Sequence, residues 1–363
     1  MSEFLQGRPE IADFEEFRGK FNEHLTVYGD GFINKTIGLG PDFHDLATDT
    51  IESIMHAGKR LRPYLTYLGY SAGGEANSEV AYGLGMALEL YHSALLVHDD
   101  IMDRDLVRHG TPNVMGKYRQ RLSETDETRR DQLSMSMGLL SGDLLFGLSI
   151  DEVLKLPVPD TIKTTLLAHM TQLNTFECAG QQLDALLQTR DPLQVSVDEL
   201  QAMYVNKTAR YSYVTPLEFG AIVGGLSQET RDGLTEYGLA LGVAFQVVDD
   251  VLGVFGNEVT LGKPVTSDLE EGKKTILMSH ALALTNADER AFLLDLLNDG
   301  VVSDTHFERT KQILESCGAL QATLDMASEL GEKARASIQP LEIDTSVKEQ
   351  LEFLIDKSIN RTF

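Results

Sequence analysis

A run of apolar residues that ends in three carboxylates constrains this chain more than any other feature. The stretch Tyr91–Asp103 reads YHSALLVHDDIMD, and its acids are Asp99, Asp100 and Asp103. Residues four and seven apart share one face of an α-helix, so His92, Asp99 and Asp103 lie along a single stripe. The flanking residues are apolar nearly all round, as expected of a helix inside a sizeable domain. The stretch therefore predicts a buried helix that ends in a carboxylate cluster.

The carboxylates at this helix end are hard oxygen ligands of the kind that suits Mg²⁺ shared with substrate phosphates. The alternative is an ordinary acidic helix end in solvent. Guanidinium groups bind phosphate oxygens bidentately, so cations close behind the acids favour a phosphate-binding metal site. Such cations follow at once: Arg104, Arg108, His109, Lys117, Arg119 and Arg121.

Helical periodicity dominates the remainder of the chain, and no segment alternates convincingly in the manner of a strand. No repeat of fixed period is evident. We therefore expect one α-helical domain over residues 1–363, with short connections. The polar and charged segment 123–132, SETDETRRDQ, is expected to be a mobile loop.

Composition limits the possible partners and the compartment. The chain has 31 basic and 56 acidic residues, a net charge of −25, which argues against general nucleic-acid binding. Two cysteines, Cys178 and Cys317, are too few for a disulfide framework and favour a reducing, cytoplasmic setting. No uninterrupted apolar run reaches about 18 residues, so no membrane span is expected. The first residues lack the basic start and apolar middle of a signal peptide.

A second stretch repeats the pattern of the first. The sequence EYGLALGVAFQVVDDVLGVFG leads an apolar helix into Asp249 and Asp250, with Gln246 one turn earlier. Cations again follow, at Lys263 and Lys273. Two apolar helices that each end in paired acids and are each followed by cations favour a pair of metal and phosphate sites over two accidental surface features.

Two further segments carry cations in unusual settings. Lys59, Arg60 and Arg62 precede Pro63, which is well placed in a helix's first turn, and a helix N-terminus with three cations is a plausible anion site. Lys207 stands within an apolar helix and needs an anionic partner if it is buried. Gln181 and Asp184, on the predicted helix over residues 160–190, either face an internal cavity or are ordinary polar helix positions. The alternatives are a solvated basic turn and a lysine that reaches the surface.

Taken in order, these motifs resemble those of the trans-polyprenyl diphosphate synthase family. The resemblance runs from roughly residue 50 to residue 285 and rests on GKRLRP, HSALLVHDDIMD, VRHGTP, KTA, FQVVDD and GKPVTSDLEEGKKT. It implies an isoprenoid synthase-like fold, a single domain of mostly antiparallel helices around a deep central cavity. It also implies a homodimer, with the two aspartate motifs facing each other across the cavity mouth.

The resemblance implies a role for each matching residue. Two or three Mg²⁺ ions would bind Asp99, Asp103 and Asp249, with Asp100 and Asp250 beside them. Isopentenyl diphosphate would bind Lys59, Arg62 and His92. The allylic diphosphate would bind Arg108, and the groups around it and the developing cation would be Lys207, Thr208, Gln246, Lys263 and Lys273.

Three positions depart from the family pattern. Ala57-Gly58 stands where paired glycines are common. His109 stands where a second arginine normally helps to bind isopentenyl diphosphate, and it replaces that arginine only in part and with a pH dependence. Gly253 stands where the second motif commonly ends in a third aspartate. We retain the catalytic interpretation because both carboxylate pairs are present.

The implied activity is head-to-tail condensation of isopentenyl diphosphate with an allylic diphosphate. Product length is expected to depend on Tyr91, Ala94 and Leu95, below the first motif. Ala94 is small where a bulky aromatic tends to stop growth early, and Tyr91 is the expected floor, which predicts geranylgeranyl diphosphate. The alternatives are a farnesyl or longer-chain synthase, a class I terpene cyclase, a non-catalytic synthase subunit and a purely structural helical scaffold.

Overall fold

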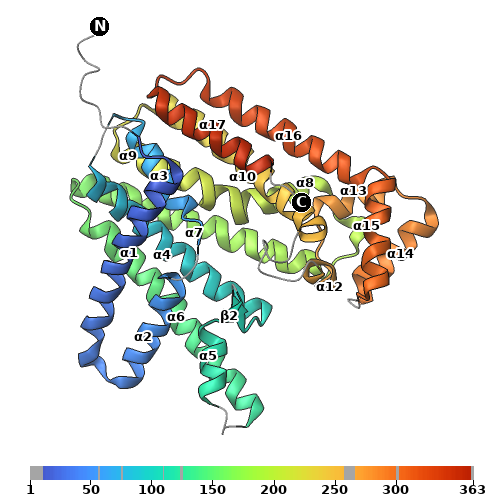
Figure 1. The fold of residues 1–363 in the computed structure, drawn as a ribbon, viewed down its shortest axis with the longest axis horizontal. Coiled ribbons are helices and arrows are strands. Elements are labelled where there is room, and N and C mark those ends of the chain that lie inside the picture. Colours follow the sequence, from blue (N-terminus) through green and yellow to red (C-terminus); the bar gives the residue numbers. More distant parts are fainter. Residues whose placement is uncertain are drawn as a thin grey trace. The chain divides into compact units, whose positions relative to one another are not determined.

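The computed structural model describes residues 11–55, 58–74, 77–108, 110–122, 126–256, 266–299 and 302–360 of the chain. These residues are almost entirely helical, which confirms the predicted all-α class (Figure 1). The chain forms two compact units, and two of its helices, α7 and α9, run from one into the other. Unit 1 comprises Met1–Leu167 and Phe219–Gly225, and unit 2 comprises Ala168–Glu218 and Leu226–Phe363. One domain over residues 1–363 stays a prediction.

Unit 1 consists of helices and one minimal hairpin. Its elements are α1 (Phe14–Thr36), the 3₁₀ turn η1 (Ile37–Leu39), α2 (Pro41–Met55), α3 (Leu61–Ser71), α4 (Ser78–Asp103), β1 (Val107–Arg108), β2 (Thr111–Pro112), α5 (Val114–Arg121), α6 (Glu127–Lys155) and the start of α7 (Asp160–Gln188). The strands pair antiparallel, Val107 with Pro112 and Arg108 with Thr111. Strands were not expected, because two-residue strands are too short to show alternation.

Helix α4 packs closely against α6, and small residues on α6 make this possible. A Cβ atom added at Gly142 would lie 2.1 Å from Nε2 of His98, and one at Gly138 would lie 3.1 Å from the Ile101 side chain. The buried Ser149 hydroxyl donates a 2.7 Å hydrogen bond to the Ala87 carbonyl on α4. The α6 backbone therefore approaches the helix that carries the first acidic motif.

The expected loop over 123–132 is wrong for the part that the structure describes. Helix α6 already begins at Glu127, and Asp126 caps it by accepting a hydrogen bond from the Arg129 amide. A carboxylate at this position satisfies a backbone N–H that has no partner within the helix. The first turn of α6 carries no apolar residue, so its composition resembles that of a loop.

Unit 2 surrounds α10 with shorter helices. Its elements are the rest of α7, the 3₁₀ turn η2 (Pro192–Gln194), α8 (Val197–Tyr204), the π-helical segment η3 (Val205–Val214), the start of α9 (Thr215–Val223, which belongs to unit 1 from Phe219 onward), α10 (Gln228–Phe255), α12 (Ser267–Glu270), α13 (Ile276–Leu284), α14 (Ala287–Asp299), α15 (Asp304–Ser316), α16 (Ala319–Ile338) and α17 (Thr345–Ile359). Pro216 lies in the first turn of α9, which continues directly from η3, so the helical run passes through this proline.

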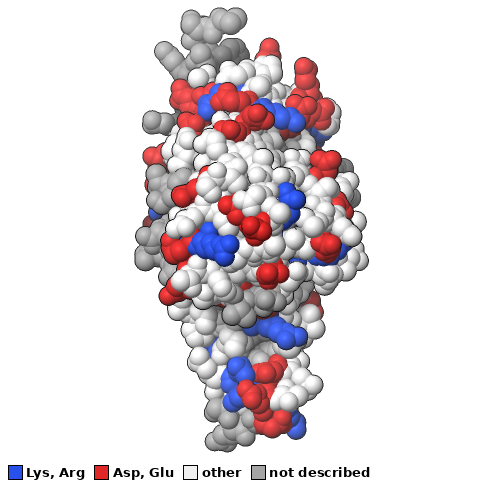
Figure 2. Space-filling model, turned by 90° about the vertical axis from the view of Figure 1, so that its right-hand side faces the viewer, with Lys and Arg blue, Asp and Glu red and all other residues white. Residues whose placement is uncertain are grey.

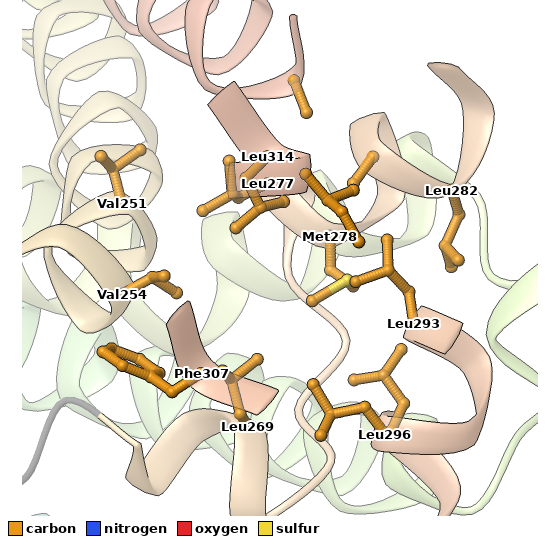
Figure 3. Packing of buried hydrophobic residues seen from close by; sticks show 14 residues of the cluster. Val251, Val254, Leu269, Leu277, Met278, Leu282, Leu293, Leu296, Phe307 and Leu314 are labelled. Carbon is orange, nitrogen blue, oxygen red and sulfur yellow. The ribbon is translucent and has the colours of Figure 1, made fainter. Parts of the chain in front are cut away.

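Helix α10 is the centre of the unit 2 core. It packs against α16, α17 and η3, and Val251 and Val254 near its C-terminal end join a buried cluster with Leu277 and Leu293 (Figure 3). A second cluster includes Leu200, Tyr204 and Val247. Apolar contacts on both sides hold the end of α10, which carries the second acidic motif, in a fixed position.

Three described helices are long and apolar enough to cross a membrane by length and composition alone: α4, α6 and α10. Most of the apolar window of α4 and of α10 is buried inside the protein, at 72% each, whereas only 39% of the α6 window is buried. Charged groups are widely distributed, and Figure 2 shows acidic and basic side chains interspersed on one face.

Candidate active site

The first acidic site consists of Asp99, Asp100 and Asp103 at the C-terminal end of α4. Arg104 ends the helix in a left-handed conformation, with φ of 60°, and its amide donates to the carbonyls of Asp100 and Ile101. Asp99 is half-buried and Asp103 is exposed, one turn apart on the same face. The expected stripe of carboxylates is therefore present, and the chain leaves the helix directly after it.

Asp100 does not share the helix face of Asp99 and Asp103, and it forms an ion pair with Arg108 on strand β1. Both Nε and Nη2 of Arg108 donate to Oδ1 of Asp100, at 2.8 Å and 2.5 Å. Burial raises the pKa of the Asp100 carboxyl above its ordinary value, although the hydrogen bonds from Arg108 act in the opposite direction. The pair fixes the guanidinium group behind the acidic helix end.

A cavity of about 340 Å³ lies beside this pair. Its walls are mainly apolar and include Leu96 and Val97 of α4 and Val114 of α5. Lys117, Arg119 and Arg121 of α5 are bound to acids of α2 and α6: Lys117 to Asp49 and Glu52, Arg119 to Glu127 and Asp131, and Arg121 to Asp49. These three cations therefore join α5 to α2 and α6, whereas Arg108 pairs with Asp100 of the acidic motif.

The basic stretch before α3 divides into a buried and a more accessible part. Arg60 is 3% exposed, and its Nη1 lies 2.5 Å from Oε1 of Glu89 on α4. Its other nitrogens donate to Oδ1 of Asn22 at 2.8 Å and to the Ile54 carbonyl at 2.8 Å. The interpretation of Arg60 as part of an anion site is therefore wrong, because its donors are used within the protein.

Lys59 and Arg62 flank this buried arginine in the chain. Lys59 is exposed, and Arg62, in the first turn of α3, is half-buried. Arg60 has a left-handed backbone, with φ of 57°, which is uncommon for a residue with a side chain. His92 is half-buried on α4, against which α3 packs.

The predicted chain-length residues lie on α4 before the acids. Tyr91 is 3% exposed, and its ring meets the Phe146 ring of α6 edge-on, with centroids 5.2 Å apart. Ala94 is fully buried, and Leu95 is half-buried. Their effect on product length stays a prediction.

The second acidic site, Asp249 and Asp250, lies near the C-terminal end of α10. A hollow of about 160 Å³ opens there, lined by residues of five segments that include Asp184, Lys207, Thr208, Gln246 and Lys273. The structure thus brings together five predicted residues of this unit and the two acids. Lys263 and His109 lie outside the described residues.

Lys207 has the anionic partner that its position in an apolar segment requires. Its Nζ lies 2.5 Å from Oδ2 of Asp184 on α7, and both side chains are partly buried. Thr208 follows, and its hydroxyl donates to Oε1 of Gln246 at 3.2 Å. Lys273 lies 2.6 Å from Oε2 of Glu271. The site therefore holds cations beside carboxylates.

Tyr204 is a residue of this site that sequence reasoning missed. It is the last residue of α8, it is 3% exposed, and its hydroxyl donates to Oδ2 of Asp250. The one signal in the sequence was that Tyr204 lies one helical turn before Lys207. A tyrosine buried at such a place usually needs a hydrogen-bond partner for its hydroxyl.

Comparison with known proteins agrees with these motifs. The polyprenyl synthetase family model matches residues 44–315. A geranylgeranyl diphosphate synthase of Saccharolobus solfataricus is 31% identical over 324 residues, which cover 88% of this chain and 91% of that protein. A short chain isoprenyl diphosphate synthase of Methanocaldococcus jannaschii is 33% identical over 259 residues, which cover 71% of this chain and 72% of that protein.

Solved structures of prenyl diphosphate synthases are also similar to this chain. A geranylgeranyl pyrophosphate synthase from Corynebacterium glutamicum, solved with isoprenyl diphosphate and magnesium, superposes with a TM-score of 0.89 at 26% identity, covering 97% of this chain and all of that one. A polyprenyl synthase from Caulobacter crescentus, solved with calcium and isoprenyl diphosphate, gives a TM-score of 0.77 at 26% identity and covers 97% of this chain and 99% of that one. The predicted enzyme class, a trans-prenyltransferase, is confirmed, and the chain belongs to the polyprenyl synthetase family.

Proposed function

We propose that this protein is a Mg²⁺-dependent synthase that condenses isopentenyl diphosphate with an allylic diphosphate and releases geranylgeranyl diphosphate. The observation that carries the proposal is the pair of acidic helix ends, on α4 and α10, each with a fixed cation nearby: Arg108 beside Asp100, and Lys207 beside Asp184. Geranylgeranyl diphosphate synthases among the relatives support the product.

The donor set fits magnesium. Carboxylate oxygens are the ligands that Mg²⁺ prefers, and it is usually held by one or two carboxylates together with substrate phosphates. Among the described residues, no three His, Cys, Asp or Glu side chains converge into a metal site. Asp99, Asp103 and Asp249 would hold two or three ions together with oxygens of the substrate diphosphates. When bound, Mg²⁺ neutralises the charge that develops on the diphosphate leaving group.

The chain's own residues bind and orient the two substrates. Arg108, Lys207 and Lys273 hold the allylic diphosphate, with Lys263 as a further predicted contact. Lys59, Arg62 and His92 hold isopentenyl diphosphate, and His109 contributes in part. Holding both substrates in reacting geometry replaces a random encounter by an intramolecular step.

The proposed reaction breaks one bond of the allylic substrate and forms one new carbon–carbon bond. The allylic C–O bond breaks and its electron pair leaves with the diphosphate. The oxygens of Thr208 and Gln246 stabilise the allylic cation, since fixed dipoles need no reorganisation. The double bond of isopentenyl diphosphate then forms the new C–C bond, and the departing diphosphate takes the proton that is lost. Apolar walls exclude water, which would otherwise trap the cation.

We further propose that the protein is a homodimer and that it acts in the cytoplasm. Cys178 and Cys317 are both free thiols, which suits a reducing compartment. Helix α6 presents a row of exposed apolar side chains, and large exposed apolar patches typically mark interaction surfaces. These side chains are Met135, Leu139, Leu140, Ile150 and Leu154.

The decisive experiment is product analysis with purified protein, Mg²⁺, isopentenyl diphosphate and each allylic primer in turn. We expect consumption of isopentenyl diphosphate, a geranylgeranyl product and loss of turnover after chelation of the metal. Asp103→Asn should lower kcat more than about 100-fold, beyond the 10- to 100-fold loss typical of groups that only support a metal ligand. Hydrocarbon release without isopentenyl diphosphate would indicate a terpene cyclase. No turnover by the purified protein unless a partner synthase is added would indicate a non-catalytic subunit.

A further inference from the structure

We propose that Tyr204 is a positioning residue, which holds Asp250 inside the protein so that Asp249 alone of this pair is presented to the metal. The inference deepens the proposed function and rests on it. It assigns Tyr204 a role that the sequence motifs do not contain, and it gives the place of Asp250 beside the ligand a structural reason.

The Tyr204 hydroxyl connects three helices. It donates to Oδ2 of Asp250 on α10 and accepts a 3.4 Å hydrogen bond from the backbone amide of Ile276, at the start of α13. Helix α8, which ends at Tyr204, packs against both of these helices (Figure 1). Burial and the neighbouring Asp250 raise the pKa of Tyr204 well above its ordinary value, so the hydroxyl keeps its proton and can donate.

Asp250 is surrounded by protein donors on both oxygens. Its Oδ1 accepts a 3.3 Å hydrogen bond from Nε2 of Gln246, and its Oδ2 accepts the hydrogen bond from Tyr204. The residue is 6% exposed, whereas Asp249 is half-buried and lines the same hollow. A carboxylate whose two oxygens already accept protein hydrogen bonds is suited to orienting its neighbours.

The network extends to the residues assigned to the allylic cation. Thr208 donates to Oε1 of Gln246, and Nε2 of the same glutamine donates to Oδ1 of Asp250. Loss of the Tyr204 hydroxyl would leave one oxygen of a buried carboxylate without this donor, which is unfavourable. Asp250 and Gln246 would then adopt other rotamers, and the position of Asp249 would be less well defined.

The test compares Tyr204→Phe with Tyr237→Phe. Tyr237 is also fully buried, stands earlier on α10, and donates a 2.8 Å hydrogen bond to the Leu351 carbonyl on α17. Each variant therefore deletes one buried hydroxyl, and a purely structural role predicts the same behaviour for both. Two quantities are measured: the Mg²⁺ concentration for half-maximal activity, and the binding of Mg²⁺ with inorganic pyrophosphate by calorimetry.

We expect Tyr204→Phe to need about 10- to 100-fold more Mg²⁺, the range for residues that support a metal ligand, and to bind magnesium pyrophosphate more weakly. Tyr237→Phe should match the unaltered protein in both measurements. Equal metal dependence of the two variants would overturn the inference. If the unaltered protein binds magnesium pyrophosphate but does not consume isopentenyl diphosphate, the proposed function fails while the calorimetric comparison still tests Tyr204.

A second pair of variants keeps the test decisive if Tyr204→Phe does not fold. Asparagine keeps one oxygen that accepts the hydrogen bond from Tyr204 and loses only the acceptor for the longer hydrogen bond from Gln246, so Asp250→Asn should lose less than about 10-fold in turnover. Asp249→Asn should lose more than about 100-fold, beyond the range for supporting residues. Equal losses in the two variants would make Asp250 a ligand and contradict the proposal.

Discussion

Arg60 and Glu89 form an ion pair that is almost completely shielded from water, with side chains 3% and 4% exposed. The guanidinium group also donates to Asn22 and to the carbonyl of Ile54. Removing one partner of a buried pair is costly because the other charge remains buried without compensation. The pair therefore fixes the turn from which Lys59 and Arg62 extend.

We predict that Glu89→Ala destabilises the protein by about 3–5 kcal/mol. In a protein of this size the unfolding midpoint should fall by about 4–7 °C, measured by calorimetry. Glu15→Ala, which removes an exposed pair with Arg18, is the matched control and should change the midpoint little. A midpoint for Glu89→Ala equal to that of the control would show that the buried pair contributes nothing.

Single residues differ in how well the sequence predicts them. Lys207 was expected to need an anion because a cation in an apolar helix is recognisable from its neighbours, and Asp184 supplies that anion. Arg60 could not be separated from Lys59 and Arg62, since three adjacent cations look alike until burial is known. Tyr204 was missed because its partner, Asp250, is 46 residues away.

The π-helical segment η3 is the element whose shape matters most for the site, because it carries Lys207 and Thr208. Glycines on two neighbouring helices let its backbone come close. A Cβ atom at Gly180 of α7 would lie 2.5 Å from the Lys207 nitrogen, and one at Gly242 of α10 would lie 2.5 Å from Cα of Ala209. Wide turns of this kind are frequently found at functional sites.

We predict that Gly180→Ala displaces the Lys207 backbone and costs about 1–3 kcal/mol through overpacking. The KM for the allylic diphosphate should rise, since Lys207 is one of its proposed ligands. Gly19→Ala on α1 is the control, because nothing lies within 4 Å of the added methyl group and the helix gains about 0.5–1 kcal/mol. Kinetics and thermal unfolding measure both effects, and an unchanged KM in a destabilised Gly180→Ala protein would refute the coupling.

Whole helices were predictable where apolar periodicity continues over many residues, as in α4 and α10. The wide turns of η3 were not, because the sequence there keeps a helical pattern that does not distinguish a π-helix from an α-helix. The same limit applies to the hairpin β1–β2. The hairpin brings Arg108 to Asp100, eight residues away in the chain. The sequence motif shows that both residues are present but not that their side chains form an ion pair.

At the scale of the whole molecule, charge and apolar surface act in opposite directions on self-association. Each chain carries a net charge of −25, so two copies repel each other at low ionic strength. Helix α6 nevertheless exposes Leu139 and Leu140 at 52% and 50%, on a side of the helix that also carries Met135, Ile150 and the exposed Asp143. Salt screens repulsion between exposed charges and leaves apolar burial largely intact. A dimer formed through α6 should therefore tighten as salt is added.

We predict that replacing Leu139 and Leu140 together by glutamate converts the proposed dimer to a monomer, because two charges would have to be buried in an apolar interface. Sedimentation velocity at several salt concentrations measures the change. Val27→Glu on α1, at a residue that is 73% exposed and belongs to another helix, controls for added charge and should leave the dimer intact. If the unaltered protein is a monomer at every salt concentration, a second copy is excluded as the partner of α6. If the unaltered protein then binds lipid vesicles and the double variant does not, α6 is assigned to a membrane surface.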